Sequence, residues 1–571
     1  MELAHFLKVA RGDQPADLVL SNGRVINVFT GEIIEADVAI ANDTIVGVGS
    51  DYEAGEEMDL GGRYVCPGLI DSHVHIESSM LTPPQFARAV VPRGTTTAVT
   101  DPHEIANVAG AVGVQYMLDV SEGLPLSVYV NLPSCVPATD MGTAGADLSA
   151  DDLVALADLD RVIGLAEFMN VPGVVMGLPG VLEKLLAFKG RVIDGHAPAV
   201  SGKWLQAYVG AGPGSDHECL AEDEMLEKLR LGMYVFIRES TATKNLRALV
   251  PAVTPENSRR CALGTDDRHP ADLLDEGHLD HLMRMAITEG LDPITVIQMA
   301  TLNAAEWFRL HDRGAIAPGR RADLVVFSDL KDFQVEMVYS GGALVAQDGL
   351  PTGEWSVPAI DDAHLRDSVR VDWERLDFTI EARAGSIRVI GVVPDQAVTE
   401  HLVEPANVVG GMATAVPERD LIKMAVIERH NQTGRVGLGF VRGLGLKHGA
   451  LAGSVGHDAH NLTIAGCDDV SMMTAARAVG ELGGGLVAAA GEEVLGSVPL
   501  PIAGLMSDQP VETVRRQMDR LVAIAKDLGS TLHDPFMALG FLALEAIPAL
   551  KLTDQGLVDV EKFDFVPLWV E

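Results

Sequence analysis

Short strand-like runs alternate with helix-length amphipathic runs through the middle of the chain. The strand-like runs lie near residues 69–76, 95–101, 127–133, 161–167, 190–196, 212–217, 232–238 and 260–266. Helical stretches separate them, for example at 105–120, 150–158, 181–188, 222–231 and 271–289. Eight βα repeats over roughly 240 residues are typical of a TIM-like (β/α)8 barrel. A doubly wound sheet is the alternative, but it would not bring the ends of the first, middle and last strands to one point.

Strand-like runs also flank this region. Residues 16–65 contain several, with a hairpin expected at Ser21-Asn22-Gly23, but too few to bury a good core alone. Runs of the same character recur at 322–327 and 337–340. We therefore predict a composite small β-sandwich domain built from residues 1–65 plus 312–362. The barrel would occupy 66–311, and a separate α+β domain would occupy 363–571.

The charge balance narrows the classes of partner. The 571 residues include 43 basic and 81 acidic side chains, a net charge of −38. Such acidity disfavours nucleic acid and anionic membranes as partners. No apolar run reaches about 18 residues, and the N-terminus lacks the apolar core of a signal peptide. We expect a cytoplasmic protein with no membrane span, and the five scattered cysteines indicate no disulfide framework.

Metal-competent side chains follow five of the predicted strands. His73 and His75 are two residues apart, so a strand places both side chains on one face. Barrel active sites lie at the C-terminal strand ends, where such side chains would meet. One polar strand end is ordinary, but six metal-competent side chains at five strand ends predict a metal site. The candidate ligands are His73, His75, Glu167, His196, His217 and Asp266.

Six ligands exceed what one tetrahedral catalytic ion needs, so two ions are expected, with Glu167 as the candidate bridge. Imidazole and carboxylate ligands without thiolate allow zinc, manganese or iron(II). Metal ions lower the pKa of bound water and supply hydroxide near neutral pH. Hydroxide attack on an electron-poor carbon is hydrolysis of an amide or of an amidine-like C–NH2 group. Asp266 is the candidate that carries the proton to the leaving amine.

Several motifs give the chain a family resemblance. They are DSHVHIESSM (71–80), DPHEIANV (101–108), DGHAP (194–198), SDHE (215–218), GTDDRHPAD (264–272), GHDAHN (456–461) and LPIAGLMSD (500–508). With them the chain resembles the amidohydrolase superfamily and, within it, the bacterial adenine deaminases. The resemblance spans almost the whole chain. It implies conversion of adenine to hypoxanthine and ammonia in purine salvage, with two divalent ions, manganese or iron(II) ahead of zinc.

The strand-four position separates this family from other amidohydrolases. Many relatives bridge their metals there with a carboxylated lysine, whereas this chain has Glu167. Lys184 and Lys189 fall in or after the following helix, which makes them poor substitutes. A hydantoinase-like or dihydroorotase-like activity is therefore disfavoured.

The resemblance also suggests which residues bind the purine. Glu77 is the candidate proton donor to the ring and joins Asp266 and His217 as a catalytic candidate. For His103 and Glu104, capping of the following helix is the alternative interpretation. The candidate substrate-binding residues are Asp101, His103, Glu104, Arg238, Glu239 and Asp458. His278 and His281 are three residues apart in a predicted helix and are expected on its solvated face.

Two other functions were weighed. The first is another amidohydrolase activity, on a cyclic amide or a different aminated heterocycle. The second is a non-catalytic scaffold, which the intact ligand set disfavours. A small-molecule substrate, adenine, is thus the expected partner, and a homodimer is expected from the family alone.

Overall fold

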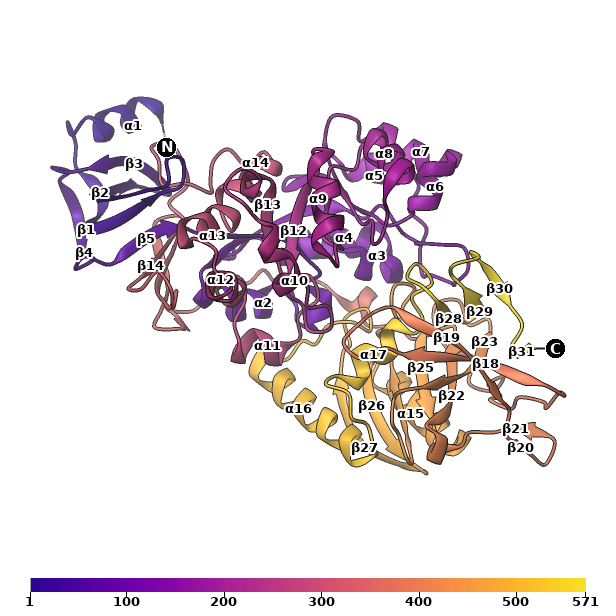
Figure 1. The fold of residues 1–571 in the computed structure, drawn as a ribbon. Coiled ribbons are helices and arrows are strands. Elements are labelled where there is room, and N and C mark those ends of the chain that lie inside the picture. The colour runs from indigo at the N-terminus through magenta and orange to yellow at the C-terminus, as the bar shows by residue number, and fades with distance from the viewer. Residues whose placement is uncertain (1, 571) are drawn as a thin grey trace.

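The computed structural model describes residues 2–570 (Figure 1). A small β structure lies at one end, the βα-rich segment in the middle, and residues 363–570, called here the C-terminal segment, at the other end. Within residues 2–570, no helix is both long enough and apolar enough to cross a membrane.

Strands occupy all eight positions predicted for the middle of the chain. Five form one parallel sheet in chain order, and three form a second parallel sheet. At one seam the Asp266 amide donates to the His73 carbonyl at 2.9 Å, and at the other the Gly214 amide donates to the Ile193 carbonyl at 3.0 Å. The strands are β6 (Leu69–Val74), β7 (Thr95–Thr100), β8 (Ser127–Leu132), β9 (Val162–Phe168), β10 (Val192–Gly195), β11 (Ser215–Asp216), β12 (Tyr234–Arg238) and β13 (Cys261–Gly264). These sheets confirm a mixed α/β architecture with a parallel half-barrel, and full closure of the barrel stays a prediction.

Helices separate these strands, and two predicted helices are each divided in two. The 105–120 run breaks at Gly110, where φ is +62°, and the 271–289 run breaks near Gly277, where φ is +119°. Glycine adopts these positive φ values without the steric cost of a Cβ, so the helix ends there. The helices are α2 (Pro83–Val90), α3 (His103–Ala109), α4 (Ala111–Val120), α5 (Ala150–Leu156), α6 (Val171–Met176), α7 (Pro179–Ala187), α8 (Gly202–Ala211), α9 (Glu222–Arg230), α11 (Pro270–Asp275) and α12 (Leu279–Thr288).

One nine-stranded sheet draws on both sides of the middle segment. β5 (Tyr64–Pro67) pairs with β14 (Leu324–Phe327), so strands about 250 residues apart are neighbours. The hairpin predicted at Ser21-Asn22-Gly23 is wrong. β2 (Glu32–Ala41) pairs along the whole of β1 (Ala16–Asn27), and a bulge between Leu20 and Gly23 absorbs the turn-like residues. The other strands are β3 (Thr44–Gly49), β4 (Ala54–Asp59), β15 (Val335–Ser340), β16 (Ala343–Gln347) and β17 (Leu350–Pro351).

The C-terminal segment is built on a second nine-stranded sheet, with order β19-β18-β23-β22-β25-β24-β26-β27 and β31 beside β18. α15 (Asp469–Glu481) shares a hydrophobic cluster with Ala425 and Ile427, whereas α16 (Val511–Asp527) shares another with Met424 and Val426. Alternate residues of one strand point to opposite faces, so the two helices cover opposite faces of the sheet. The strands are β18 (Ser386–Val392), β19 (Thr399–Pro405), β22 (Leu421–Ile427), β23 (Val436–Arg442), β24 (Ala450–Gly453), β25 (Leu462–Gly466), β26 (Gly485–Ala490), β27 (Glu493–Pro499) and β31 (Trp569–Val570).

The C-terminal segment shares a core with the middle of the chain. Side chains of α16 lie in one hydrophobic cluster with Phe86 and Val90 of α2 and Leu273 of α11. Arg515 of α16 also donates to Asp275 of α11 at 2.6 Å. Burial of this apolar seam fixes the C-terminal segment beside the strand ends of β6 to β13, where it becomes part of the candidate site.

Candidate active site

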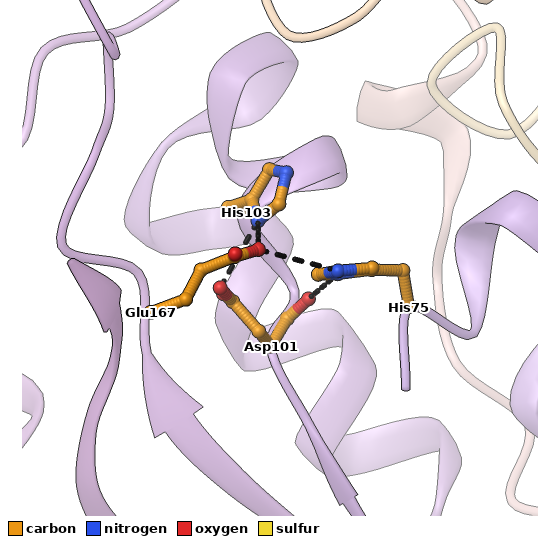
Figure 2. Close-up of side chains that lie close together, drawn as sticks. All are labelled: His75, Asp101, His103 and Glu167. Atoms are coloured by element: carbon orange, nitrogen blue, oxygen red, sulfur yellow. Dashed lines mark hydrogen bonds and ion pairs between the residues drawn. The ribbon is translucent and has the colours of Figure 1, made fainter. Parts of the chain in front are cut away.

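The two histidines at the end of β6 face each other. The Nε2 atoms of His73 and His75 lie 3.1 Å apart, and both side chains are buried. His75 Nδ1 is 2.9 Å from the backbone carbonyl of Asp101, which only accepts hydrogen bonds (Figure 2). The proton of neutral His75 therefore lies on Nδ1, and Nε2 is left as a free ligand atom.

Glu167, at the end of β9, directs its two oxygens to different histidines. Oε1 lies 3.3 Å from His75 Nε2, as Figure 2 shows. Oε2 lies 2.6 Å from His196 Nδ1 and 3.1 Å from His217 Nε2. One carboxylate thus stands between the pair from β6 and the histidines that follow β10 and β11.

Asp266 follows β13 and is held by an arginine. Its Oδ1 lies 3.3 Å from His75 Nε2, and Arg238 Nη1 donates to Oδ2 at 2.5 Å. Arg238 Nη2 also donates to Glu218 Oε2 at 2.7 Å. Burial alone would raise the pKa of Asp266, but Arg238 and His75 outweigh it and hold that pKa well below the ordinary value.

This donor set fits divalent metal ions. Four imidazoles and two carboxylates are buried together, and none of the six is a thiolate. His73, Glu167 and His217 offer donor atoms within 4.8 Å of one another, as do His73, His75 and Asp266. Buried carboxylates and imidazoles of this kind suit zinc, manganese or iron(II). All six predicted ligands therefore meet in one buried cluster.

Asp101, His103 and Glu104 lie against this cluster. His103 Nδ1 is 3.0 Å from Asp101 Oδ2 and 3.5 Å from Glu167 Oε1 (Figure 2). Glu104 Oε1 is 2.7 Å from His457 Nδ1, and Oε2 contacts His460 Nε2. His103 and Glu104 begin α3, but neither side chain caps the helix. Both side chains contact residues of the site or of the C-terminal segment instead.

The C-terminal segment covers the cluster. His457, Asp458, Ala397, Phe541, Leu544 and Ile547 line the same cavity as the histidines. Asp458 Oδ1 lies 3.7 Å from His103 Nε2, and its Oδ2 is buried without a hydrogen-bond partner among residues 2–570. The cavity therefore has a charged floor and a mainly apolar roof, and Asp458 presents an acceptor between them.

Four predicted residues do not line this cavity. Asp101 and His73 contact residues that do, whereas Glu77 and Glu239 bond to backbone amides. Glu77 Oε1 accepts from the Ile105 amide at 3.2 Å, and burial raises the pKa of Glu77 to about 7. Glu239 Oε2 accepts from the Leu246 amide at 3.2 Å. Neither side chain lines the cavity that contains the histidines. Their predicted roles as proton donor and purine ligand have no direct geometric support.

The sequence reasoning missed two positions. Glu218, in the SDHE motif, pairs with Arg238 beside the ligands, a role that the motif alone does not predict. Its position next to His217 is the signal that the sequence offers. His278 was expected on a solvated face, and this is wrong. It is fully buried, with Nδ1 2.8 Å from Thr95 Oγ1 and Nε2 3.1 Å from Asp71 Oδ2. Helical periodicity does not reveal that the α12 N-terminus meets the strands.

The network around His278 supports the end of β13. Asp71 of β6 accepts from the Thr265 hydroxyl at 2.5 Å and from the Thr265 amide at 3.0 Å. Thr265 directly precedes Asp266. These buried bonds fix the backbone from which Asp266 reaches the histidines.

Comparison with known proteins identifies the family. The amidohydrolase family model matches residues 64–345, and the adenine deaminase C-terminal domain model matches residues 396–564. The chain is 51% identical to an adenine deaminase of Desulfatibacillum aliphaticivorans over 99% of both chains. It is 50% identical to adenine deaminase 2 of Carboxydothermus hydrogenoformans over 98% of both.

A third relative, the adenine deaminase of Brucella suis, is 47% identical over 97% of this chain and 95% of its own. The amidohydrolase match carries a dependence on divalent metal, which the buried donor set fits. The resemblance seen in the sequence motifs is confirmed over nearly the full length. The chain belongs to the adenine deaminase family of the amidohydrolases.

Proposed function

We propose that the chain hydrolyses adenine to hypoxanthine and ammonia by attack at C6, and that it serves purine salvage. Relatives of about half identical sequence and equal length are adenine deaminases. The observation that carries the proposal is that the six candidate ligands form one buried cluster. Five of them line a cavity closed by the C-terminal segment, and the sixth, His73, contacts His75 beside it. A closed site of this kind excludes bulk water and strengthens the electrostatic interactions inside it.

We further propose that two divalent ions bind there, manganese or iron(II) in preference to zinc. His73, His75 and Asp266 would hold one ion, and His196 and His217 the other, with Glu167 between them. The opposed directions of the Glu167 oxygens support a bridge. When bound, such ions lower the pKa of water and supply hydroxide near neutral pH.

The chain's own residues would move the proton. Asp266 Oδ1 is free of Arg238, so it can accept the proton of the attacking water and deliver it to the leaving amine. Arg238 keeps Oδ2 occupied and so fixes the orientation of the carboxylate. His217 would assist Asp266 by fixing the position of the Glu167 carboxylate, which its Nε2 contacts.

Purine recognition would come from the opposite wall. Free adenine carries an N–H on its five-membered ring, and the unpartnered Asp458 Oδ2 is an acceptor suited to it. Asp101, His103 and Glu104 would set the rim around that contact. The roles of Glu77 and Glu239 in purine binding and protonation stay predictions. Their carboxylates accept hydrogen bonds from backbone amides outside the cavity.

The domain boundaries, the cellular location, the oligomeric state and the class of partner are also proposals. We propose domain boundaries at 1–65 plus 312–362, 66–311 and 363–571. A cytoplasmic location, a homodimer and the absence of nucleic acid as a partner are expectations from charge and family. The net charge of −38 supports the last of these.

An absorbance assay tests the activity. Purified, manganese-loaded protein is mixed with adenine, and the loss of adenine absorbance and the release of ammonia are followed together. Adenosine, cytosine and a cyclic amide serve as comparison substrates. Equimolar hypoxanthine and ammonia from adenine alone is the expected result. No turnover of adenine by protein with measured bound metal would overturn the proposal, and cleavage of the cyclic amide would favour the alternative activity.

A further inference from the structure

A second cavity lies next to the candidate active site. It has a volume of about 210 Å3 and is bounded by the 169–172 and 198–204 segments on one side and by Ala546, Pro548 and Phe563 on the other. Its walls are mainly apolar and include the indole of Trp204. Cavities for drug-sized ligands span about 300–1,000 Å3, so this one suits a smaller planar molecule.

The two cavities share residues. Met169 and His196 line both this cavity and the one that contains the metal-ligand candidates. His196 Nδ1 faces Glu167, while its Nε2 is buried with no hydrogen-bond partner among residues 2–570. The apolar cavity therefore adjoins the cluster of candidate metal ligands at His196.

Residues 544–548 of the C-terminal segment separate the two cavities. After α17 (Pro535–Phe541), Leu544 and Ile547 line the inner cavity, whereas Ala546 and Pro548 line the outer one. Ile547 is 8% exposed and its neighbour Pro548 is exposed. Residues 544–548, together with Met169, thus form a thin wall between the two spaces.

The mouth of the outer cavity is accessible and aromatic. Trp204 is 48% exposed and Phe563 is 47% exposed, and both line the cavity. Exposed aromatic surfaces beside a cavity are typical of ligand-binding sites. By contrast, the candidate ligand residues are at most 6% exposed, so a substrate cannot reach them directly from solvent.

We propose that this outer cavity is the antechamber through which free adenine reaches the metal cluster, with residues 544–548 and Met169 as its inner gate. The inference rests on the proposed function, because it names that substrate as the occupant. An apolar, partly aromatic chamber favours an uncharged planar heterocycle over a phosphorylated nucleotide. Displacement of the gate admits the base and then closes the roof over it.

A reversible block of the antechamber tests the proposal. Val200 lines the cavity and is half-buried, so a Val200→Cys thiol is accessible to benzyl methanethiosulfonate. The thiolate forms a mixed disulfide with the benzylthio group, and methanesulfinate leaves. Dithiothreitol then restores the free thiol in the same sample. Four native cysteines are buried and Cys467 is partly buried, so reagent-treated unsubstituted protein is run in parallel.

The expected result is kinetic. In the blocked manganese-loaded enzyme, kcat/KM for adenine falls at least tenfold. In stopped-flow fluorescence, the association and dissociation rates of hypoxanthine fall together, and its dissociation constant changes less than twofold. A blocked route slows both directions equally, whereas a blocked binding site would weaken affinity. Dithiothreitol reverses all these effects.

A matched control is Val154→Cys on α5. Val154 is 50% exposed and lines neither cavity, so its modification should change no rate. Unchanged hypoxanthine rates in blocked Val200→Cys would overturn the antechamber, as would a raised dissociation constant with an unchanged association rate. If unsubstituted protein bound hypoxanthine without turning over adenine, the proposed function would fail, and the same block would still test the passage.

Discussion

Arg238 Nη1 donates to Asp266 Oδ2 at 2.5 Å. The sequence suggested that Arg238 binds the purine edge. It lines the cavity, but Nη1 and Nη2 donate to Asp266 and Glu218, which leaves only Nε without a partner among residues 2–570. A planar guanidinium can hold two carboxylates at once in fixed geometry. Arg238 is thus placed to position the candidate proton carrier, and its contact with the purine stays a prediction.

Replacing Asp266 by asparagine tests its role as proton carrier. Asp266→Asn keeps an oxygen for coordination but loses the carboxylate that accepts a proton. Turnover of adenine should fall about 10²–10⁴-fold, the usual contribution of general acid–base catalysis. Metal content, measured by elemental analysis, should stay at the level of the unsubstituted protein. A rate within threefold of that protein would refute the role.

Arg238→Met would leave two buried carboxylates without their cation. Breaking a buried ion pair from one side costs about 3–5 kcal/mol, so the free energy of unfolding should fall by that order and turnover should fall with it. Urea unfolding, compared between variants, measures the change. Glu218→Gln is the partner variant: its cost should be smaller in the Arg238→Met background than alone. Additive costs would mean that the pair is not coupled.

Glu104→Gln should loosen the cover. Burial would raise the pKa of Glu104, but His457 and His460 outweigh it and hold that pKa well below its usual value. The neutral amide can accept from only one of the two histidines, so we expect a loss of about 1–3 kcal/mol in stability and a lower kcat/KM. Thermal unfolding and steady-state kinetics measure both. Glu256→Gln, on an exposed loop, is the control and should change neither.

Lys551 predicts a pH dependence of stability. It is buried, donates to the Ala397 and Phe541 carbonyls at 2.6 and 2.8 Å, and burial lowers its pKa to about 7. Between pH 7 and about 10.4, the unfolded chain holds this proton more tightly than the folded protein, so stability should rise with pH. The slope has a ceiling of about 1.4 kcal/mol per pH unit.

Lys551→Met should remove this slope. Its stability relative to the unsubstituted protein should therefore be highest near pH 7 and should decline as the pH rises. Urea unfolding at pH 7, 8 and 9 provides the comparison, with Lys203→Met on the exposed surface of α8 as control. Parallel stability curves for the Lys551 variant and the unsubstituted protein would contradict the expectation.

Removal of metal should destabilise the protein. Ions that bind only the folded state stabilise it by about 2.7 kcal/mol at a concentration one hundred times the dissociation constant. A chelator should therefore lower the thermal midpoint, and manganese should restore both the midpoint and adenine turnover. A midpoint that is the same with and without chelator, in protein shown to have lost its metal, would argue against the buried cluster as the metal site.

Much of the architecture could be read from local patterns. Alternating strand and helix runs located all eight strands of the middle segment. The sequence predictions were wrong where tertiary contacts override a local signal. Ser21-Asn22-Gly23 has turn chemistry but forms a bulge, because β2 pairs on both sides of it. Gly110 and Gly277 end helices that periodicity alone joined.

The sequence by itself determined the donor set. The spacing of His73 and His75 and the positions of Glu167, His196, His217 and Asp266 at strand ends follow from strand periodicity and from the common direction of parallel strands. Only the tertiary structure decided which charges pair and what covers them. The Glu104 carboxylate contacts His457, which lies 353 residues further along the chain. Arg238 donates a hydrogen bond to Asp266, a contact that the sequence does not predict. The reason is physical: an unpaired polar group is costly to bury, and the partner within reach is fixed by packing rather than by sequence distance.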